Sequence, residues 1–222
     1  MNTLTRKLAA KDLYLFRWLI AGAVLAGFVG LAVAGLGETG FSIGFLLWLT
    51  ALIALGVMLA LFGIANERKE RALLFVMSLP LSPQDYVRAK LFGLLLCFVL
   101  PWAALSAGAF ALILMVPGIP DGLLPYAVLL CFYLLLNYAL VLSGALHIAS
   151  EAGMGAVIIV TNMSVSLFMM GVGRIPAIAS HMWTPEPVWN AAFWQFLAFE
   201  IGTTVLVLSL PLFVAARRRD IS

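Results

Sequence analysis

Residues that could perform acid–base, nucleophilic or metal chemistry are few in this chain, and they are scattered. The 222 residues include ten acidic residues, two histidines and two cysteines. No G-x-x-x-x-G-K-[ST] motif is present to cradle nucleotide phosphates, and no H-E-x-x-H motif or cysteine cluster offers metal ligands. His147 and Glu151 stand four residues apart, which favours a polar pair at a helix end over a metal site. The sequence therefore predicts a protein that is not an enzyme and that binds no metal or cofactor itself.

Glu200 is the one charged residue well inside an apolar stretch. A carboxylate in the middle of a bilayer costs about 3 kcal/mol, so such residues usually face a partner or water. At 1.5 Å per helical residue, Glu200 lies roughly 24 Å from the Ala216 end of its stretch. Two interpretations follow: an interfacial carboxylate that reaches lipid headgroups, or a polar contact near an outer gate, with Arg174 as a possible partner.

The most polar of the apolar stretches carries a second group of candidate residues. Asn162, Ser166 and Met169 share one helical face at i, i+4 and i+7. Polar groups beside an adaptable thioether could line a substrate path. Hydrogen bonding between neighbouring helices explains the Asn and Ser equally well.

The elements that must hold these residues are membrane-spanning helices. Residues of the AVILMFWYC set make up 64% of the chain, against an apolar share of roughly 45–50% in ordinary globular proteins. Six stretches approach the length of about 20 residues that a crossing needs. They run approximately over residues 18–37, 41–65, 91–116, 124–148, 154–173 and 191–216. We therefore expect an all-α membrane protein with a single transmembrane domain over residues 1–222.

The positions of the basic residues predict the orientation. Six crossings place both termini on one side, together with twelve of the thirteen Lys and Arg residues, while the other side has Arg174 alone. Cytoplasmic loops carry such an excess, so we expect cytoplasmic termini. The net charge of +3 thus indicates membrane orientation rather than a nucleic-acid partner.

Two features near the N-terminus concern packing. Residues 2–17 have leucines at helical spacing among basic residues, which predicts an amphipathic helix on the cytoplasmic membrane surface, or else a frayed basic tail. Gly22, Ala26, Gly30 and Ala34 follow at strict four-residue spacing, which lets two helices approach closely. That approach could occur within the chain or between two copies of it.

The segment 66–90 is the longest charged connection between two spans. Pro80 and Pro83 favour a turn, and a new helix is expected to begin with Ser82 as N-cap, Pro83 at N1 and Asp85 at N3. The apolar residues of this polar segment suggest a docking surface, or alternatively a loop lying on the membrane. They are Leu79, Leu81 and Tyr86.

In this segment the chain resembles the permeases of ABC-2 type exporters. The resemblance lies in an acidic–basic start at Glu67 and Arg71, then the run S-L-P-L-S-P over 78–83, then Lys90. The layout of an interfacial helix, six spans and cytoplasmic termini is also similar. It implies a compact permease of the bacterial inner membrane that dimerises, contacts lipids and carries two separate ATPase subunits, which bind the ATP and Mg.

The resemblance implies the export of a hydrophobic or amphipathic substrate. It assigns a role in ATPase coupling to one set of residues. These are Glu67, Arg71, Leu79, Pro80, Leu81, Ser82, Pro83, Asp85, Tyr86 and Lys90. Two alternatives stay open: a permease similar to the haem exporter B of cytochrome c maturation, and a membrane scaffold that anchors a cytoplasmic partner without transport.

Overall fold

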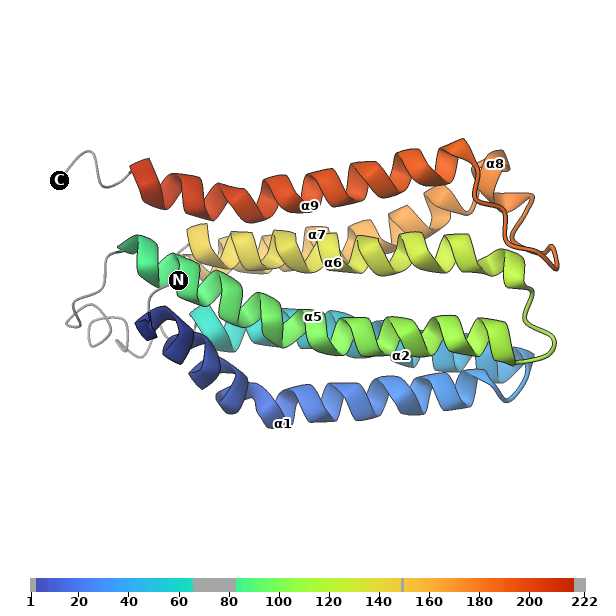
Figure 1. Ribbon diagram of the computed structural model, residues 1–222, viewed down its shortest axis with the longest axis horizontal. Coiled ribbons are helices and arrows are strands. Elements are labelled where there is room, and N and C mark those ends of the chain that lie inside the picture. Colours follow the sequence, from blue (N-terminus) through green and yellow to red (C-terminus); the bar gives the residue numbers. More distant parts are fainter. Residues whose placement is uncertain (1–2, 66–82, 149, 218–222) are drawn as a thin grey trace.

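The computed structural model describes residues 3–65, 83–148 and 150–217, which form an elongated bundle of helices (Figure 1). No strand occurs among these residues. The long helices are α1 (Thr3–Ala34), α2 (Glu38–Ala60), α5 (Pro83–Met115), α6 (Leu124–His147), α7 (Glu151–Val172) and α9 (Ala191–Arg217). Shorter pieces are a π-helical turn (Leu61–Ala65), a 3₁₀ turn (Asp121–Leu123) and α8 (Pro176–Ala179).

Six of the helices are long and apolar enough to cross a membrane, which confirms the prediction of a multi-pass membrane protein. Their apolar segments are Ala10–Ala34, Glu38–Ile64, Gln84–Met115, Asp121–His147, Glu151–Val172 and Ala191–Ala216. α6 is the most buried of the six and packs against α2, α5, α7 and α9. α1 packs against α2 and α5. The start of α1 and the end of α9 lie at the same end of the bundle, and α8 lies at the opposite end (Figure 1).

Small residues bring α1 and α2 into close contact. A Cβ atom added at Gly30 would lie 2.8 Å from the carbonyl oxygen of Gly44 and 2.8 Å from the backbone nitrogen of Trp48. One added at Gly44 would overlap the backbone of Gly30 and Ala34. Gly22 and Ala26, the other half of the predicted stripe, are exposed. The stripe therefore packs within the chain at Gly30 and Ala34, and it leaves its first half uncovered.

α1 begins far earlier than the first predicted span. Residues 3–34 form one continuous helix, whose first turns bend away from the rest in Figure 1. Its first part does not have a uniformly polar surface, because Asp12 and Phe16 are buried while Tyr14 and Leu15 are exposed. The sequence predicted a separate amphipathic helix here. The structure instead has one helix, and the interfacial position of its first turns stays a prediction.

α5 also differs from the expected span, because it begins at Pro83 rather than near residue 91. Pro83 is its first residue and Asp85 lies in its first turn, as the predicted helix start required. No glycine or proline interrupts residues 84–92, so the helix continues from this start directly into the membrane span and through Pro101. The predicted coupling residues Glu67, Arg71, Leu79, Pro80, Leu81 and Ser82 lie outside the described residues.

Candidate functional site

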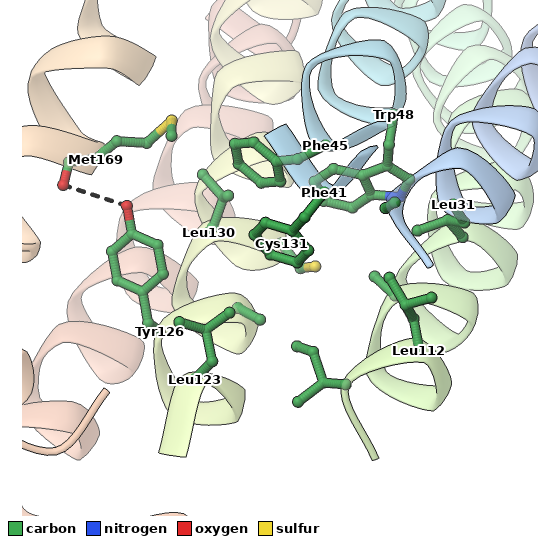
Figure 2. A pocket seen from close by; sticks show the side chains of 14 residues that line it. Leu31, Phe41, Phe45, Trp48, Leu112, Leu123, Tyr126, Leu130, Cys131 and Met169 are labelled. Atoms are coloured by element: carbon green, nitrogen blue, oxygen red, sulfur yellow. Dashed lines mark hydrogen bonds between the residues drawn. The ribbon is translucent and has the colours of Figure 1, made fainter. Parts of the chain in front are cut away.

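An apolar cavity of about 160 Å³ is drawn in Figure 2. Its residues come from the helix ends that lie remote from the chain termini in Figure 1. Five helices contribute to its wall: the end of α1, the start of α2, the end of α5, the start of α6 and the end of α7. Its lining residues are Leu31, Ala34, Phe41, Phe45, Trp48, Ala109, Leu112, Ile113, Leu123, Tyr126, Ala127, Leu130, Cys131 and Met169. We call it the apolar cavity.

One wall of the apolar cavity is a row of aromatic rings on α2. Phe41, Phe45 and Trp48 lie at i, i+4 and i+7, so their side chains share one face of the helix. The rings of Phe41 and Phe45 stack with centroids 6.4 Å apart, and those of Phe45 and Trp48 are 5.9 Å apart. Burial increases inward along this row, from the half-buried phenylalanines to Trp48, which is 3% exposed.

The polar groups of the surrounding aromatic residues are already bound to the backbone. The Trp48 indole donates to the carbonyl of Leu105 at 3.2 Å, and the Trp102 indole donates to that of Cys131 at 2.8 Å. The Tyr126 hydroxyl donates to the carbonyl of Met169 at 3.2 Å (Figure 2). These bonds leave the rings, rather than polar atoms, to face the cavity.

A second, larger hollow of about 570 Å³ adjoins the apolar cavity at the end of the bundle. We call it the vestibule. It shares Ala34, Phe41 and Leu123 with the apolar cavity, so the two spaces are neighbours along the start of α2. Its remaining wall comes from the turn between α1 and α2, the connection over residues 116–120, and Trp183. Glu38 in the first turn of α2 is the charged residue among those that line it.

The turn beside the vestibule requires a glycine. Gly37 has φ 108°, a backbone conformation that residues with a Cβ rarely adopt. It allows the chain to reverse directly from α1 into α2 within three residues. This tight reversal places Glu38 in the wall of the vestibule.

Glu200 lies in the interior of the bundle. Its side chain is 1% exposed, and neither carboxylate oxygen has a hydrogen-bond partner among the described residues. Arg174, the possible partner, is exposed in the connection between α7 and α8. Depth along a helix does not fix which face a residue occupies, and Glu200 lies on a buried face of α9, so its carboxylate is not free on the bundle surface to reach lipid headgroups.

The interior of the bundle holds two further polar residues near this part of the chain. Thr204, one turn after Glu200 on α9, is buried, and its hydroxyl donates to the carbonyl of Glu200 at 2.7 Å. Ser106 of α5 is 4% exposed. Neither Glu200 nor Ser106 is among the residues that line the apolar cavity.

The predicted stripe on α7 is divided by the structure. Met169 lines the apolar cavity, whereas Ser166 is exposed. Asn162 is half-buried, and its side-chain oxygen has no hydrogen-bond partner in the described part of the chain. The face of α7 that packs on α6 carries other polar residues: the Asn137 amide donates to the carbonyl of Thr161 at 3.2 Å, and the Tyr133 hydroxyl donates to Ser164 at 2.9 Å. The structure does not bring Asn162 or Ser166 into the cavity wall.

A buried ion pair joins α1 to α5 near the end that holds the termini. The Lys90 ammonium lies 3.1 and 3.3 Å from the two carboxylate oxygens of Asp12. Their side chains are 5% and 2% exposed. Lys90, assigned above to ATPase coupling, therefore points into the bundle, while Asp85 and Tyr86 are half-buried in the first turn of α5.

Two features of these sites were not predicted from the sequence. Asp12 stands among basic residues in a segment expected to be an amphipathic helix, so no buried ion pair was expected there. Glu38, Phe41, Phe45 and Trp48 recur at i, i+3, i+7 and i+10, the spacing of a single helical face. That spacing could have been read directly from the sequence.

No three His, Cys, Asp or Glu residues of the described ranges are grouped so that they could hold a metal ion. Comparisons with protein-family models, with curated proteins and with solved structures found no match to this chain.

Proposed function

We propose that this chain is the permease subunit of an ATP-driven exporter of the bacterial inner membrane. Two copies would form the membrane part, and two separate ATPase subunits would bind at its cytoplasmic end. The substrate is hydrophobic or amphipathic. The observation that carries the proposal is the apolar cavity with its vestibule, because a concave apolar space with few polar groups is the usual form of a small-molecule site.

The packing of the bundle supports a path that is open toward one end only. Between the apolar cavity and the end with the termini lies a dense cluster that includes Leu59, Leu94 and Phe98. The Phe98 and Tyr138 rings stack there at 4.0 Å, and the Tyr138 hydroxyl donates to the carbonyl of Leu94 at 2.8 Å. A substrate in the cavity is thus separated from the terminal end, as expected of an exporter in its outward-facing state.

The resemblance of residues 66–90 to ABC-2 permeases supports the role of the ATPase. Residues 79–86 would dock into the ATPase, and Pro83–Tyr86 belong to the first turn of α5. α5 runs without a break to the wall of the apolar cavity at Ala109, Leu112 and Ile113. A displacement of its first turn can therefore reach the cavity through a single helix.

The test is co-purification of the chain with its ATPase from cells that express both. The double variant Leu81→Asp, Tyr86→Asp should lose the ATPase, since buried apolar anchors dominate interface energies. The matched control is the double variant Leu36→Asp, Met115→Asp, which replaces two exposed apolar residues at the opposite end of the bundle and should keep the ATPase.

The same preparation separates the exporter from the alternatives. An exporter should show ATP-dependent transport in vesicles together with ATPase activity that depends on this chain. A scaffold would bind its partner without transport, and a haem exporter would move haem. A double Asp variant that still bound the ATPase and transported normally would contradict the proposal.

A further inference from the structure

We propose that the apolar cavity and the vestibule form one site for a cationic amphiphile. A compact apolar group, such as a phenyl ring, enters the cavity, and its cationic head stays in the vestibule beside Glu38. The inference deepens the proposed export function by naming its substrate class, and it rests on that function only for the direction of transport. Binding itself depends on this chain alone.

The size and chemistry of the cavity define the apolar group. An engineered apolar cavity of about 150 Å³ stays dry and binds benzene, so a cavity of 160 Å³ accepts one aromatic ring. The surrounding indole and phenol groups already donate their hydrogens to backbone carbonyls. A water molecule in the cavity would therefore find few hydrogen-bond partners. An apolar group is therefore the favoured occupant.

The row of residues on α2 defines the rest of the ligand. Glu38 and Phe45 are seven residues apart, which corresponds to about 10 Å along the helix axis. An amphiphile with a linker of three or four carbons spans this distance. Its cation would also lie near the rings of Phe41 and Trp183, which line the vestibule and can attract a positive charge through their faces.

The charges around the vestibule favour a cation over an anion. Glu38 is exposed, and no described residue forms an ion pair with it. The other lining elements add no charge: the connection over residues 116–120 is apolar, and Trp183 and Ser42 are neutral. Arg174, the basic residue of this end of the bundle, is not among the lining residues. An anionic head would thus meet a carboxylate without a compensating base.

The test uses three probes that share one apolar group: 4-phenylbutyltrimethylammonium, 4-phenylbutanol and 4-phenylbutyrate. Binding to the purified chain without ATPase, in detergent micelles, is measured by equilibrium dialysis against protein-free micelles. We expect the ammonium probe to bind at least fivefold more tightly than the alcohol, and the carboxylate to bind least.

Two variants locate the site. Ala127→Phe fills the cavity from α6 and should weaken the binding of the ammonium and alcohol probes at least tenfold. Ala26→Phe, on the exposed face of α1, should change the affinity of neither probe. Glu38→Gln changes an exposed position, so folding is not endangered. It should lower the affinity for the ammonium probe about fivefold and leave the affinity for the alcohol unchanged. Equal binding of the three probes, or an ammonium affinity unaffected by Glu38→Gln, would overturn the proposal.

The outcome is independent of the exporter proposal. If the probes bind as expected but no ATPase associates with the chain, the site stands and the export function fails. If the ATPase associates and drives transport but the probes bind without charge preference, the export function stands and this substrate class fails.

Discussion

At the scale of single residues, Glu200 presents the sharpest energetic question. It is 1% exposed in α9, and both its carboxylate oxygens lack hydrogen-bond partners among the described residues. A buried anion without a compensating cation destabilises a protein by several kcal/mol. Glu200→Gln keeps the size of the side chain but cannot be charged. We expect its thermal unfolding midpoint in detergent to equal or exceed that of the wild type.

The matched variant for this measurement is Glu38→Gln, because Glu38 is exposed and its replacement should leave the midpoint unchanged. Glu200→Lys, which puts an unpaired ammonium at the same place, should lower the midpoint by several degrees or abolish the fold. A clear loss of stability in Glu200→Gln would show that the carboxyl has a stabilising partner, such as a bound cation or a second copy of the chain.

Glu200 also shows what a sequence can predict about a residue. The residue type and its position within an apolar stretch were sufficient to name Glu200 as a candidate site residue. Its burial could not be predicted, because α9 is apolar around most of its circumference and offers no pattern that distinguishes the packed face from the lipid face. The same reason explains Ser166, which was grouped with Met169 by spacing but lies on the exposed surface.

At the scale of elements, the contact between α1 and α2 depends on three small residues. Gly44→Ala would push a Cβ into the backbone of Gly30 and Ala34, so the two helices must separate. Overpacking of this kind typically costs about 1–3 kcal/mol. We expect a lower unfolding midpoint and a lower denaturant concentration at half-unfolding.

The control is Gly22→Ala on α1, where an added Cβ meets no atom within 4 Å. Alanine has the higher helix propensity, so this variant should be neutral or slightly stabilising in the chain itself. If Gly22→Ala instead weakened self-association, the exposed half of the stripe would be a contact between two copies. If Gly44→Ala were neutral, the close packing of α1 on α2 would be wrong.

The ion pair between α1 and α5 gives a second test at this scale. Asp12→Asn and Lys90→Met each remove one partner from a buried pair, and each should destabilise the chain by about 3 kcal/mol or more. In the double variant neither charge remains, so its loss should be clearly smaller than the sum of the single losses. A double-mutant cycle of unfolding free energies measures this coupling. Strict additivity would contradict a direct interaction.

At the scale of the whole molecule, the six spans could be predicted because each is marked by length and composition. The helices extend beyond the predicted spans: α1 begins at Thr3, well before the span expected from residue 18, and α5 begins at Pro83, the helix start predicted from Pro83 and Asp85, before its apolar run. The apolar run does begin near residue 91, but a helix start is fixed by its cap and first turn rather than by hydropathy. The cavity could not be predicted, because it arises where five helices fail to fill the space between them.

The orientation of the molecule in the membrane rests on charge and can be tested directly. The predicted topology assigns twelve of the thirteen basic residues to the side of the termini, and Lys and Arg are enriched in cytoplasmic segments. Single cysteines are introduced by Asn66→Cys or Glu186→Cys after the two buried native cysteines are replaced by Cys97→Ala and Cys131→Ala. Glu186 is exposed in the connection between α8 and α9, at the end remote from the termini. An impermeant thiol reagent applied to intact cells should therefore label position 186 and not position 66, whereas both should be labelled once the membrane is permeabilised. Labelling of position 66 from outside intact cells would show that the molecule has the opposite orientation in the membrane. The vestibule would then open to the cytoplasm, where it could receive a substrate but not release one.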